Sequence, residues 1–429
     1  MKNARAFGQP AVPAPATPLL KRLGPGLVTG AADDDPSGIA TYSQAGAQFG
    51  YAMLWSVLFT LPLMIGIQIV SARIGRVTGH GLAANIREHY PAWLLHGVVG
   101  LLLVANTINI AADLAAMGEA LQLVTGGSAL VFAVMFGIAC LVAEVLIPYH
   151  RYAGYLKLLT LVLLFYVAAA FSVHIPWAEV ARATLLPAIS FDHDLILMVV
   201  AIFGTTISPY LFFWQASQEA EESRLSHRHR HSAHPQLKKN SFKSISIDTW
   251  VGMFFSNSIA FFIIVTTAAT LHMHGISHID TAAQAAEALR PIGGPLTFAL
   301  FAAGIIGTGL LAVPVLAGSA AYAVAEVFKI RGSLELPASR AIGFYAIVAA
   351  ATLGGSALLA TNIDPIAMLF WTAVINGIVA VPIMIATMLV VSSKREARLV
   401  ALPRWLLILG WLAAGLMAVA VIMLIWSSF

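Results

Sequence analysis

The stretch Gly30-Ala31-Ala32-Asp33-Asp34-Asp35-Pro36-Ser37-Gly38 sets three adjacent carboxylates inside an apolar segment that covers residues 23–49. On insertion scales each aspartate at the centre of a bilayer costs roughly 2.5–3.5 kcal/mol. Pro36 disfavours helix at Asp35, and Gly38 relaxes the backbone just beyond it. A helix that breaks here exposes carbonyls and a new helix N-terminus beside the acids. Carboxylates next to unwound carbonyls are typical ligands of a metal cation.

In a soluble protein the same residues would form an ordinary helix cap, with Asp35 preceding a proline at the first helical position. The composition argues against that interpretation. Of the 429 residues, 59% are hydrophobic and only 10% are charged, whereas a soluble protein has about 25% charged residues. The chain is therefore predicted to be an all-helical, polytopic membrane protein. Its single cysteine, Cys140, leaves no intramolecular disulfide.

Apolar segments near the ~20 residues that a membrane span requires recur along the whole chain. Eleven such spans are predicted, at about 24–47, 51–72, 93–123, 128–147, 153–173, 194–220, 248–271, 295–327, 341–359, 365–391 and 403–427. The Pro- and Ala-rich residues 1–20 are expected to form a disordered cytoplasmic tail. Residues 21–429 are expected to form a single transmembrane transport domain.

The distribution of basic residues predicts the orientation in the membrane. With the N-terminus inside, all of the 24 Lys and Arg residues except Arg182 and Arg290 fall on the inner side, as the positive-inside rule requires. We therefore expect an integral membrane protein, in a bacterial inner (cytoplasmic) membrane, with a cytoplasmic N-terminus and an outer C-terminus.

A second predicted break lies in span six, at Gly204-Thr205-Thr206-Ile207-Ser208-Pro209-Tyr210. Spans one and six each begin a block of five spans. Paired broken helices in corresponding positions indicate a transporter built from two inverted repeats whose unwound segments meet at the midplane. The repeats are predicted at about 24–173 and 194–391, with an extra helix at about 403–427.

Other polar residues lie at membrane depth. Asn106, Asn109 and Asp113 share one helix face in span three, and span four carries Glu144. For the asparagines, and for Asn376 in span ten, an interhelical hydrogen bond worth about 0.6 kcal/mol is the simpler interpretation. Asp113 is ionisable and is better assigned to a pathway or relay.

The end of span six is acidic, with Glu219, Glu221 and Glu222. This pattern fits either a cation exit or a solvated helix terminus. The tract from Ser226 to His234 alternates Arg with His, which favours a solvated loop over a metal site. His272, His274 and His278 form a second group, on the outer side.

Three motifs resemble the first helix of the Nramp family of divalent-metal transporters, namely Gly24-Pro25-Gly26, Asp35-Pro36 and Gln44-Ala45-Gly46-Ala47. Ala111-Ala112-Asp113-Leu114-Ala115 with Gly118 resembles the third helix of that family. The resemblance covers spans one to ten in order. It implies the LeuT-type fold, with a metal ion held between broken helices one and six.

The departures from the family pattern concern the site itself. The family motif Asp-Pro-Gly-Asn is here Asp35-Pro36-Ser37-Gly38, and Met-Pro-His is Ser208-Pro209-Tyr210. The acid expected shortly after Asp113 is matched by Ala116. These changes replace soft ligands by hard oxygen donors, which predicts the magnesium-transporting branch of the family, with Mn²⁺ also accepted. The loss of the His and of the acid predicts that metal flux is not tightly coupled to protons.

These observations predict a secondary transporter, not an enzyme, that moves divalent cations by alternating access and favours Mg²⁺. The alternatives are a proton-coupled Mn²⁺/Fe²⁺ importer, an organic-substrate carrier of the same fold, and an intramembrane aspartyl enzyme that uses Asp35 and Asp113. No cofactor and no nucleic acid are expected; the expected partners are the metal substrate and the bilayer. The predicted metal-site residues are Asp35, Asp34, Gly38, Thr205 and Ser208. The predicted pathway or relay residues are Asp33, Asp113, Tyr210, Glu219 and Asn376.

Overall fold

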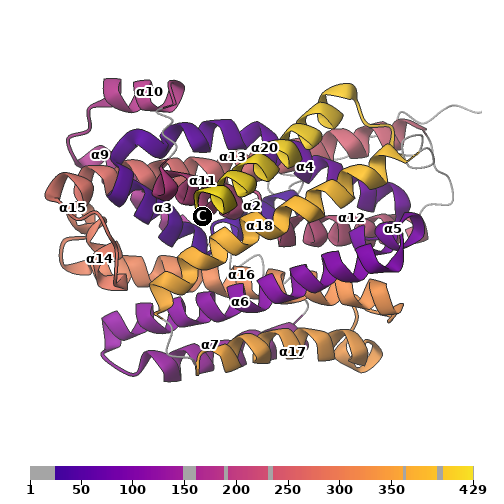
Figure 1. Cartoon of the computed structure of the whole chain (residues 1–429). Helices are drawn as coiled ribbons and strands as arrows, with labels where there is room; N and C mark the ends of the chain where they lie inside the picture. The colour runs from indigo at the N-terminus through magenta and orange to yellow at the C-terminus, as the bar shows by residue number, and fades with distance from the viewer. Residues whose placement is uncertain are drawn as a thin grey trace, which may run out of the picture.

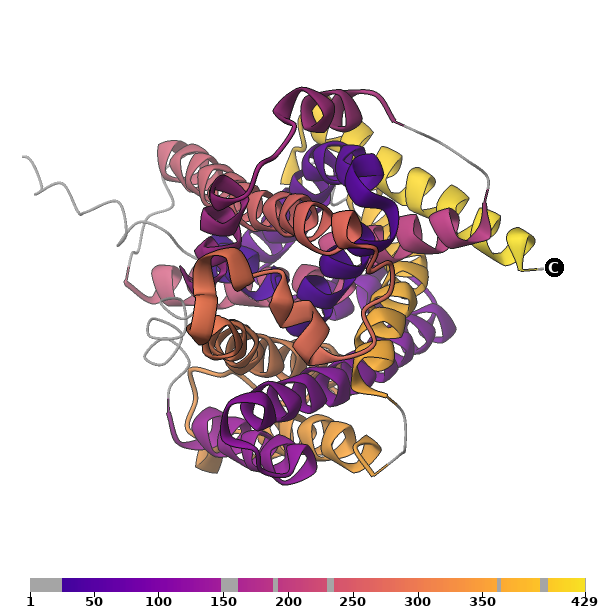
Figure 2. The same ribbon diagram turned by 90° about the vertical axis from the view of Figure 1, so that its left-hand side faces the viewer.

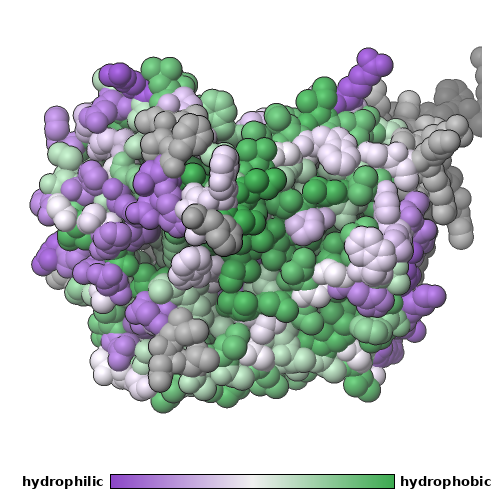
Figure 3. Space-filling model, in the orientation of Figure 1, coloured by the Kyte–Doolittle hydropathy of each residue, from purple (hydrophilic) through white to green (hydrophobic). Residues whose placement is uncertain are grey.

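The computed structural model describes residues 25–147, 161–187, 192–229, 235–360, 364–393 and 400–428. The tail predicted at 1–20 and part of the fifth predicted span lie outside these residues. Every regular element in the described ranges is a helix. The long helices run side by side across the molecule in Figure 1, and the visible face in Figure 3 has a broad apolar band between two hydrophilic ends. The predicted all-helical polytopic architecture is confirmed.

The first predicted span is two helices, α2 (Pro25–Asp33) and α3 (Pro36–Phe49), and the break falls at Asp34 and Asp35 as predicted. Asp35 has extended backbone dihedrals and caps α3, while Pro36 occupies the first helical position, where its missing N–H costs nothing. The chain continues with η1 (Gly50–Met53), α4 (Leu54–Thr78), α5 (Leu82–His89), α6 (Ala92–Thr125), α7 (Ala129–Leu146), η2 (Leu161–Leu163), α9 (Leu164–Ser172) and α10 (Trp177–Leu185).

Span six is broken in the same manner, into α11 (His193–Thr206) and α12 (Pro209–His229). After α12 come α13 (Pro235–Thr270), η3 (His272–His274), α14 (Ala282–Glu287), α15 (Arg290–Gly293), η4 (Gly294–Leu296), α16 (Thr297–Phe328), η5 (Ala338–Arg340), α17 (Ile342–Leu358) and α18 (Pro365–Ser392). The extra helix α20 (Arg404–Ser427) packs against α4, α11 and α18. Eight helical stretches in the described ranges are long and apolar enough to cross a membrane, and α17 is a shorter apolar helix.

The two broken helices lie against each other in the middle of the molecule. α3 packs on α11 and α2 packs on α12, and both halves of the first broken helix also pack on α13. α10, α14 and α15 lie at the same end of the molecule, with α10 apart from the other two, whereas α5 lies at the opposite end (Figures 1 and 2). We call the end with α5 and the start of α2 the inner side, following the predicted topology.

Candidate metal site between the two broken helices

The Asp35 carboxylate is buried between the two helix breaks and is 2% exposed. Its Oδ1 accepts hydrogen bonds from the Ser37 hydroxyl and the Gly38 backbone N–H, both at 2.7 Å. Its Oδ2 accepts from Asn109 Nδ2 at 3.1 Å and from the Tyr210 hydroxyl at 3.3 Å. All four donors are electrically neutral, so hydrogen bonds orient this carboxylate without cancelling its charge.

Tyr210 connects the two breaks directly. It follows Pro209 at the start of α12, and its hydroxyl also lies 3.0 Å from the carbonyl oxygen of Ala32 near the end of α2. Gly38 and Thr205 make a second connection, because a Cβ added at Gly38 would lie 2.9 Å from Thr205 Oγ1. α3 and α11 can therefore approach this closely only because residue 38 has no side chain.

Asp33 and Asp34 point to different partners from those of Asp35. Ser256 Oγ on α13 lies 2.6 Å from Asp33 Oδ2 and 3.0 Å from Asp34 Oδ1. The other oxygen of each carboxylate has no hydrogen-bond partner among the described residues. The single Ser256 hydrogen is thus shared by two buried carboxyl groups that lie next to Asp35 in the chain.

Further predicted residues lie around this centre. The Ser208 hydroxyl donates back to the carbonyls of Gly204 at 3.1 Å and Thr205 at 2.7 Å. Asp113 is fully buried and faces the Ser37 backbone N–H, although within the described ranges neither of its oxygens meets the geometry of a hydrogen bond. Asn376 is buried in α18, and its amide likewise lacks a partner there.

The sequence did not identify Ser256 or Asp248, which hold the first broken helix against α13. Both residues lie on a long helix with many other polar side chains, so no spacing singles them out. Among the described residues, no group of three His, Cys, Asp or Glu side chains is arranged to hold a metal ion. A metal ion at Asp35 would accordingly be coordinated by carbonyl, hydroxyl and amide oxygens as well as by carboxylates.

An outer cavity of about 480 Å³ opens beside α3. It is lined by α3, the start of α11, residues 278–280 and the start of α18, and it reaches Ala40. Ala40 lies five residues beyond Asp35, or about 7.5 Å along the helix. Asp194, Asp280 and Asp364 line the cavity, so the approach from this side is acidic.

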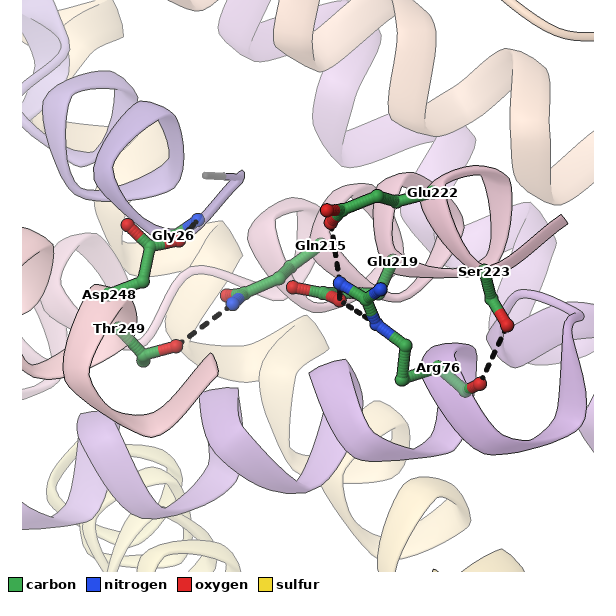
Figure 4. Close-up of polar contacts among 8 residues, drawn as sticks. All are labelled: Gly26, Arg76, Gln215, Glu219, Glu222, Ser223, Asp248 and Thr249. Atoms are coloured by element: carbon green, nitrogen blue, oxygen red, sulfur yellow. Dashed lines mark hydrogen bonds and ion pairs between the residues drawn. The ribbon is translucent and has the colours of Figure 1, made fainter. Parts of the chain in front are cut away.

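On the inner side a network of polar contacts joins α2, α4, α12 and α13 (Figure 4). Asp248 Oδ2 accepts from the Gly26 backbone N–H at 2.7 Å, and Gln215 Nε2 donates to Thr249 Oγ1 at 3.0 Å. Arg76 Nη2 pairs with Glu219 and Glu222 at 2.5 Å each. Glu219 therefore forms an ion pair in this structure and does not face an open exit.

Comparisons with known proteins agree with this architecture. The chain is 26% identical over 405 residues to a divalent metal cation transporter, MntH, from Klebsiella pneumoniae, covering 92% of each chain. It is 29% identical over 301 residues to MntH from Yersinia enterocolitica, covering 68% of this chain and 69% of that protein.

Two solved structures share the fold. A manganese transporter from Eremococcus coleocola superposes with a TM-score of 0.69 at 17% identity, covering 96% of this chain and 88% of that one. Mhp1, a nucleobase-cation-symport-1 family transporter, superposes with a TM-score of 0.56 at 12% identity, covering 95% and 92%. These structures confirm the predicted LeuT-type fold.

The family model for natural resistance-associated macrophage protein-like sequences matches residues 26–427. This range contains both broken helices, the outer cavity and the inner network. The chain belongs to the Nramp family, a family of transporters and not of enzymes.

Proposed function

We propose that this chain carries divalent metal cations across the membrane by alternating access, with Mn²⁺ as its principal substrate and Asp35 as the principal ligand. The observation that carries the proposal is the uncompensated Asp35 carboxylate, buried where two broken helices meet and hydrogen-bonded only to neutral groups. A buried charge without a counter-charge is costly, and a bound cation would offset that cost.

The names of the relatives support Mn²⁺ over Mg²⁺. Two bacterial relatives are divalent metal cation transporters, and one solved structure of the same fold is a manganese transporter. The magnesium preference expected from the sequence finds no support there, and the alternative of a Mn²⁺/Fe²⁺ importer is favoured instead. Oxygen donors suit Mn²⁺ as well as Mg²⁺, so the chemistry of the site agrees with this substrate.

The oxygen atoms nearest to Asp35 complete the proposed site. Asn109 Oδ1 has no partner among the described residues, although its Nδ2 donates to Asp35, so a flip or small rotation of this amide would present an oxygen to the metal ion. Thr205 lies against Gly38, and Ser208 lies at the break with its hydroxyl turned toward its own helix. We keep direct coordination for Asp35, because Asp33 and Asp34 contact Ser256 on α13 instead.

The two sides of the site differ in a way that supports alternating access. The acidic outer cavity extends to within about two helical turns of Asp35, whereas on the inner side hydrogen bonds and ion pairs join four helices (Figure 4). In the proposed cycle a cation enters from the outer cavity and binds at Asp35. Separation of α2 from α13 then opens the inner side.

The test is metal uptake into proteoliposomes that contain the purified full chain, with Mn²⁺, Mg²⁺ and Ca²⁺ supplied separately. Mn²⁺ uptake should exceed that of the other two ions. Asp35→Asn keeps the size of the side chain and removes its charge. It should lower Mn²⁺ uptake at least about tenfold, the effect of losing 1.4 kcal/mol of binding free energy.

Asp192→Asn is the matched control, because Asp192 is exposed at the start of α11 and lies away from the site. This variant should transport like the parent. Parent-like uptake by Asp35→Asn would remove Asp35 from the site, and absence of Mn²⁺ uptake by the parent would refute the proposed substrate.

A further inference from the structure

An inner cavity of about 220 Å³ lies where α5, α12 and α16 pack on one another. These three helices reach the same end of the molecule in Figure 1. The cavity is separate from the outer cavity beside α3, and none of the residues that line it belongs to the proposed metal site. Its volume admits a phosphate group, so we examine which ligand its lining fits.

Basic side chains from three segments of the chain line the inner cavity. Arg87 comes from α5, Arg224 from α12, and Lys329 and Arg331 from the stretch that follows α16. His80 also lines the cavity, but burial and the neighbouring Arg224 lower its pKa, so it adds no charge near pH 7. Four positive charges therefore converge on one cavity from parts of the chain that are far apart in sequence.

Two acidic side chains line the same cavity, and both have partners in the protein. Glu326 accepts hydrogen bonds from the backbone N–H groups of Gly81 at 2.6 Å and Ala84 at 3.0 Å, at the start of α5. Glu221 accepts a hydrogen bond from the Tyr322 hydroxyl at 2.8 Å. With both acids ionised, the described side chains of the lining still carry an excess of two positive charges.

Backbone carbonyls hold the two arginines in place. Arg224 Nε donates to the carbonyl oxygen of Gly79 at 2.8 Å, and Arg87 donates to the carbonyl oxygen of Glu326. A guanidinium group has five N–H donors, so these contacts leave donors on each arginine for a ligand. Arginine forks match the geometry of phosphate oxygens, which makes a phosphate group the anion that this lining fits.

A buried hydroxyl adds a neutral donor to the lining. Ser217 is 3% exposed, and its Oγ has no hydrogen-bond partner among the described residues. A Cβ added at Gly81 would lie 2.7 Å from this oxygen, so Ser217 lies beside the start of α5. The hydroxyl can donate one hydrogen bond, and a phosphate oxygen in the cavity would accept it.

Apolar side chains border the cavity on the side of α17. Ile330 lines the cavity, and Phe328 and Ile342 next to this edge are 65% and 72% exposed. A Cβ added at Gly343 would lie 2.9 Å from Ile330 Cγ2, so the edge of the cavity continues onto the start of α17. Basic pockets between membrane helices on the cytoplasmic side suit lipid headgroups. The adjacent apolar surface can contact acyl chains, which a soluble phosphate lacks.

We propose that the inner cavity binds the phosphate group of an anionic phospholipid from the inner leaflet. The four basic side chains compensate the charge of the phosphate, and Ser217 donates a hydrogen bond to one of its oxygens. The lipid bridges α12, which is half of the second broken helix, to α5 and α16. Binding of the lipid needs neither Asp35 nor a metal ion, so this inference is independent of the proposed transport function.

The experiment measures the binding of short-chain phosphatidic acid to the purified full chain in a neutral detergent. Its phosphate monoester has a charge of about −1.5 to −2 at pH 7, which matches the excess positive charge of the lining. Native mass spectrometry gives the affinity, and the thermal unfolding midpoint should rise, as it does with a ligand of the folded state. Short-chain phosphatidylcholine and inorganic phosphate at the same concentration should raise the midpoint much less.

The variants separate the cavity from a general attraction of anionic lipid to a basic surface. Lys329→Gln with Arg331→Gln removes two exposed charges of the lining and should lower the affinity for phosphatidic acid about tenfold or more. The matched control is Arg340→Gln with Arg404→Gln, which removes two exposed charges outside the cavity and should bind like the parent. Ser217→Ala changes no charge and should lower the affinity about fivefold, the effect of one lost hydrogen bond.

Four outcomes would contradict the proposal. Equal losses of affinity in the two double variants would indicate a general surface attraction and overturn the site. Unchanged affinity in Ser217→Ala would overturn the placement of the phosphate in the cavity. Equal stabilisation of the parent by inorganic phosphate would overturn the lipid as the source of the phosphate. Stabilisation by phosphatidic acid no greater than that by phosphatidylcholine would overturn the whole proposal, while metal uptake tests the transport function separately.

Discussion

Asp248 on α13 accepts a hydrogen bond at 2.7 Å from the backbone N–H of Gly26, at the start of α2. The two residues are 222 positions apart in the chain. A carboxylate at a helix N-terminus satisfies an otherwise unpaired N–H group and interacts favourably with the helix dipole. This contact holds the inner half of the first broken helix against α13 in this structure.

Asp248→Ala should release the start of α2 and favour opening of the inner side. Loss of such a cap costs about 1 kcal/mol, which corresponds to a roughly fivefold shift in the equilibrium. The shift can be measured with Val28→Cys, a buried position on α2, labelled from the inner side by a membrane-impermeant maleimide. Cys140 is buried and should give a low background. Each Asp248 variant is combined with Val28→Cys. Asp248→Asn keeps an acceptor oxygen, so its labelling rate should be almost as low as that of Val28→Cys alone. Equal labelling rates in Val28→Cys alone and in its combinations with Asp248→Ala and Asp248→Asn would show that Asp248 does not hold α2.

Arg76 should stabilise the protein through Glu219 far more than through Glu222. The Glu219 side chain is 1% exposed, whereas that of Glu222 is 54% exposed. Arg76→Gln would leave a buried carboxylate without its cation, at a cost of about 3–5 kcal/mol. Glu222→Gln removes an exposed pair worth about 1 kcal/mol or less. Thermal unfolding midpoints in detergent should fall clearly for the first variant and little for the second, and similar midpoints would contradict this assignment.

The effects of substitutions at Gly38 and Thr205 on the unfolding temperature should be coupled. A Cβ at position 38 would lie 2.9 Å from Thr205 Oγ1, and a β-branched side chain has few rotamers in a helix through which to move away. Gly38→Ala should therefore lower the unfolding temperature, while Gly38→Ala with Thr205→Ala should recover part of that loss. A double variant as unstable as the sum of the two single changes would show that the two residues do not meet.

The sequence predicted the parts of the site that arise from local chemistry. Each of the two X-Pro steps, at Asp35-Pro36 and Ser208-Pro209, breaks its helix at the expected residue, because proline acts on its immediate neighbours wherever the helix is placed. The long spans were also predicted, since bilayer thickness sets their length. Asp35 and Tyr210 come together as the paired breaks implied, and Asn109 makes an interhelical hydrogen bond, of the kind expected for it, to Asp35 itself.

The remaining features depend on packing between distant segments. Ser256 meets Asp33 and Asp34 across more than 200 residues, and no local pattern on α13 indicates that contact. The short helices α5, α10, α14 and α15 were not predicted, because their apolar periodicity is too brief to separate them from loops. The direction of the Ser208 hydroxyl also depends on the local geometry of the break, which composition does not determine.

The last prediction concerns selectivity at Ser208. Its hydroxyl donates to the carbonyls of Gly204 and Thr205, so its hydrogen is already used within its own helix. Ser208→Ala should therefore leave Mn²⁺ affinity near that of the parent. Ser208→Met is different, because it places a polarizable thioether at the break, close to the proposed ion.

A thioether favours soft ions and displaces water that Mg²⁺ releases reluctantly. Ser208→Met should consequently bind Cd²⁺ and Mn²⁺ more tightly relative to Mg²⁺. A ligand change of this kind is worth about 1–3 kcal/mol, or roughly one to two orders of magnitude in relative affinity. Calorimetric titration of the parent and both variants with Cd²⁺, Mn²⁺ and Mg²⁺ measures the effect. If the relative affinities of Ser208→Met equal those of Ser208→Ala, residue 208 does not face the metal ion, and the second broken helix must bind it through Thr205 and backbone carbonyls instead.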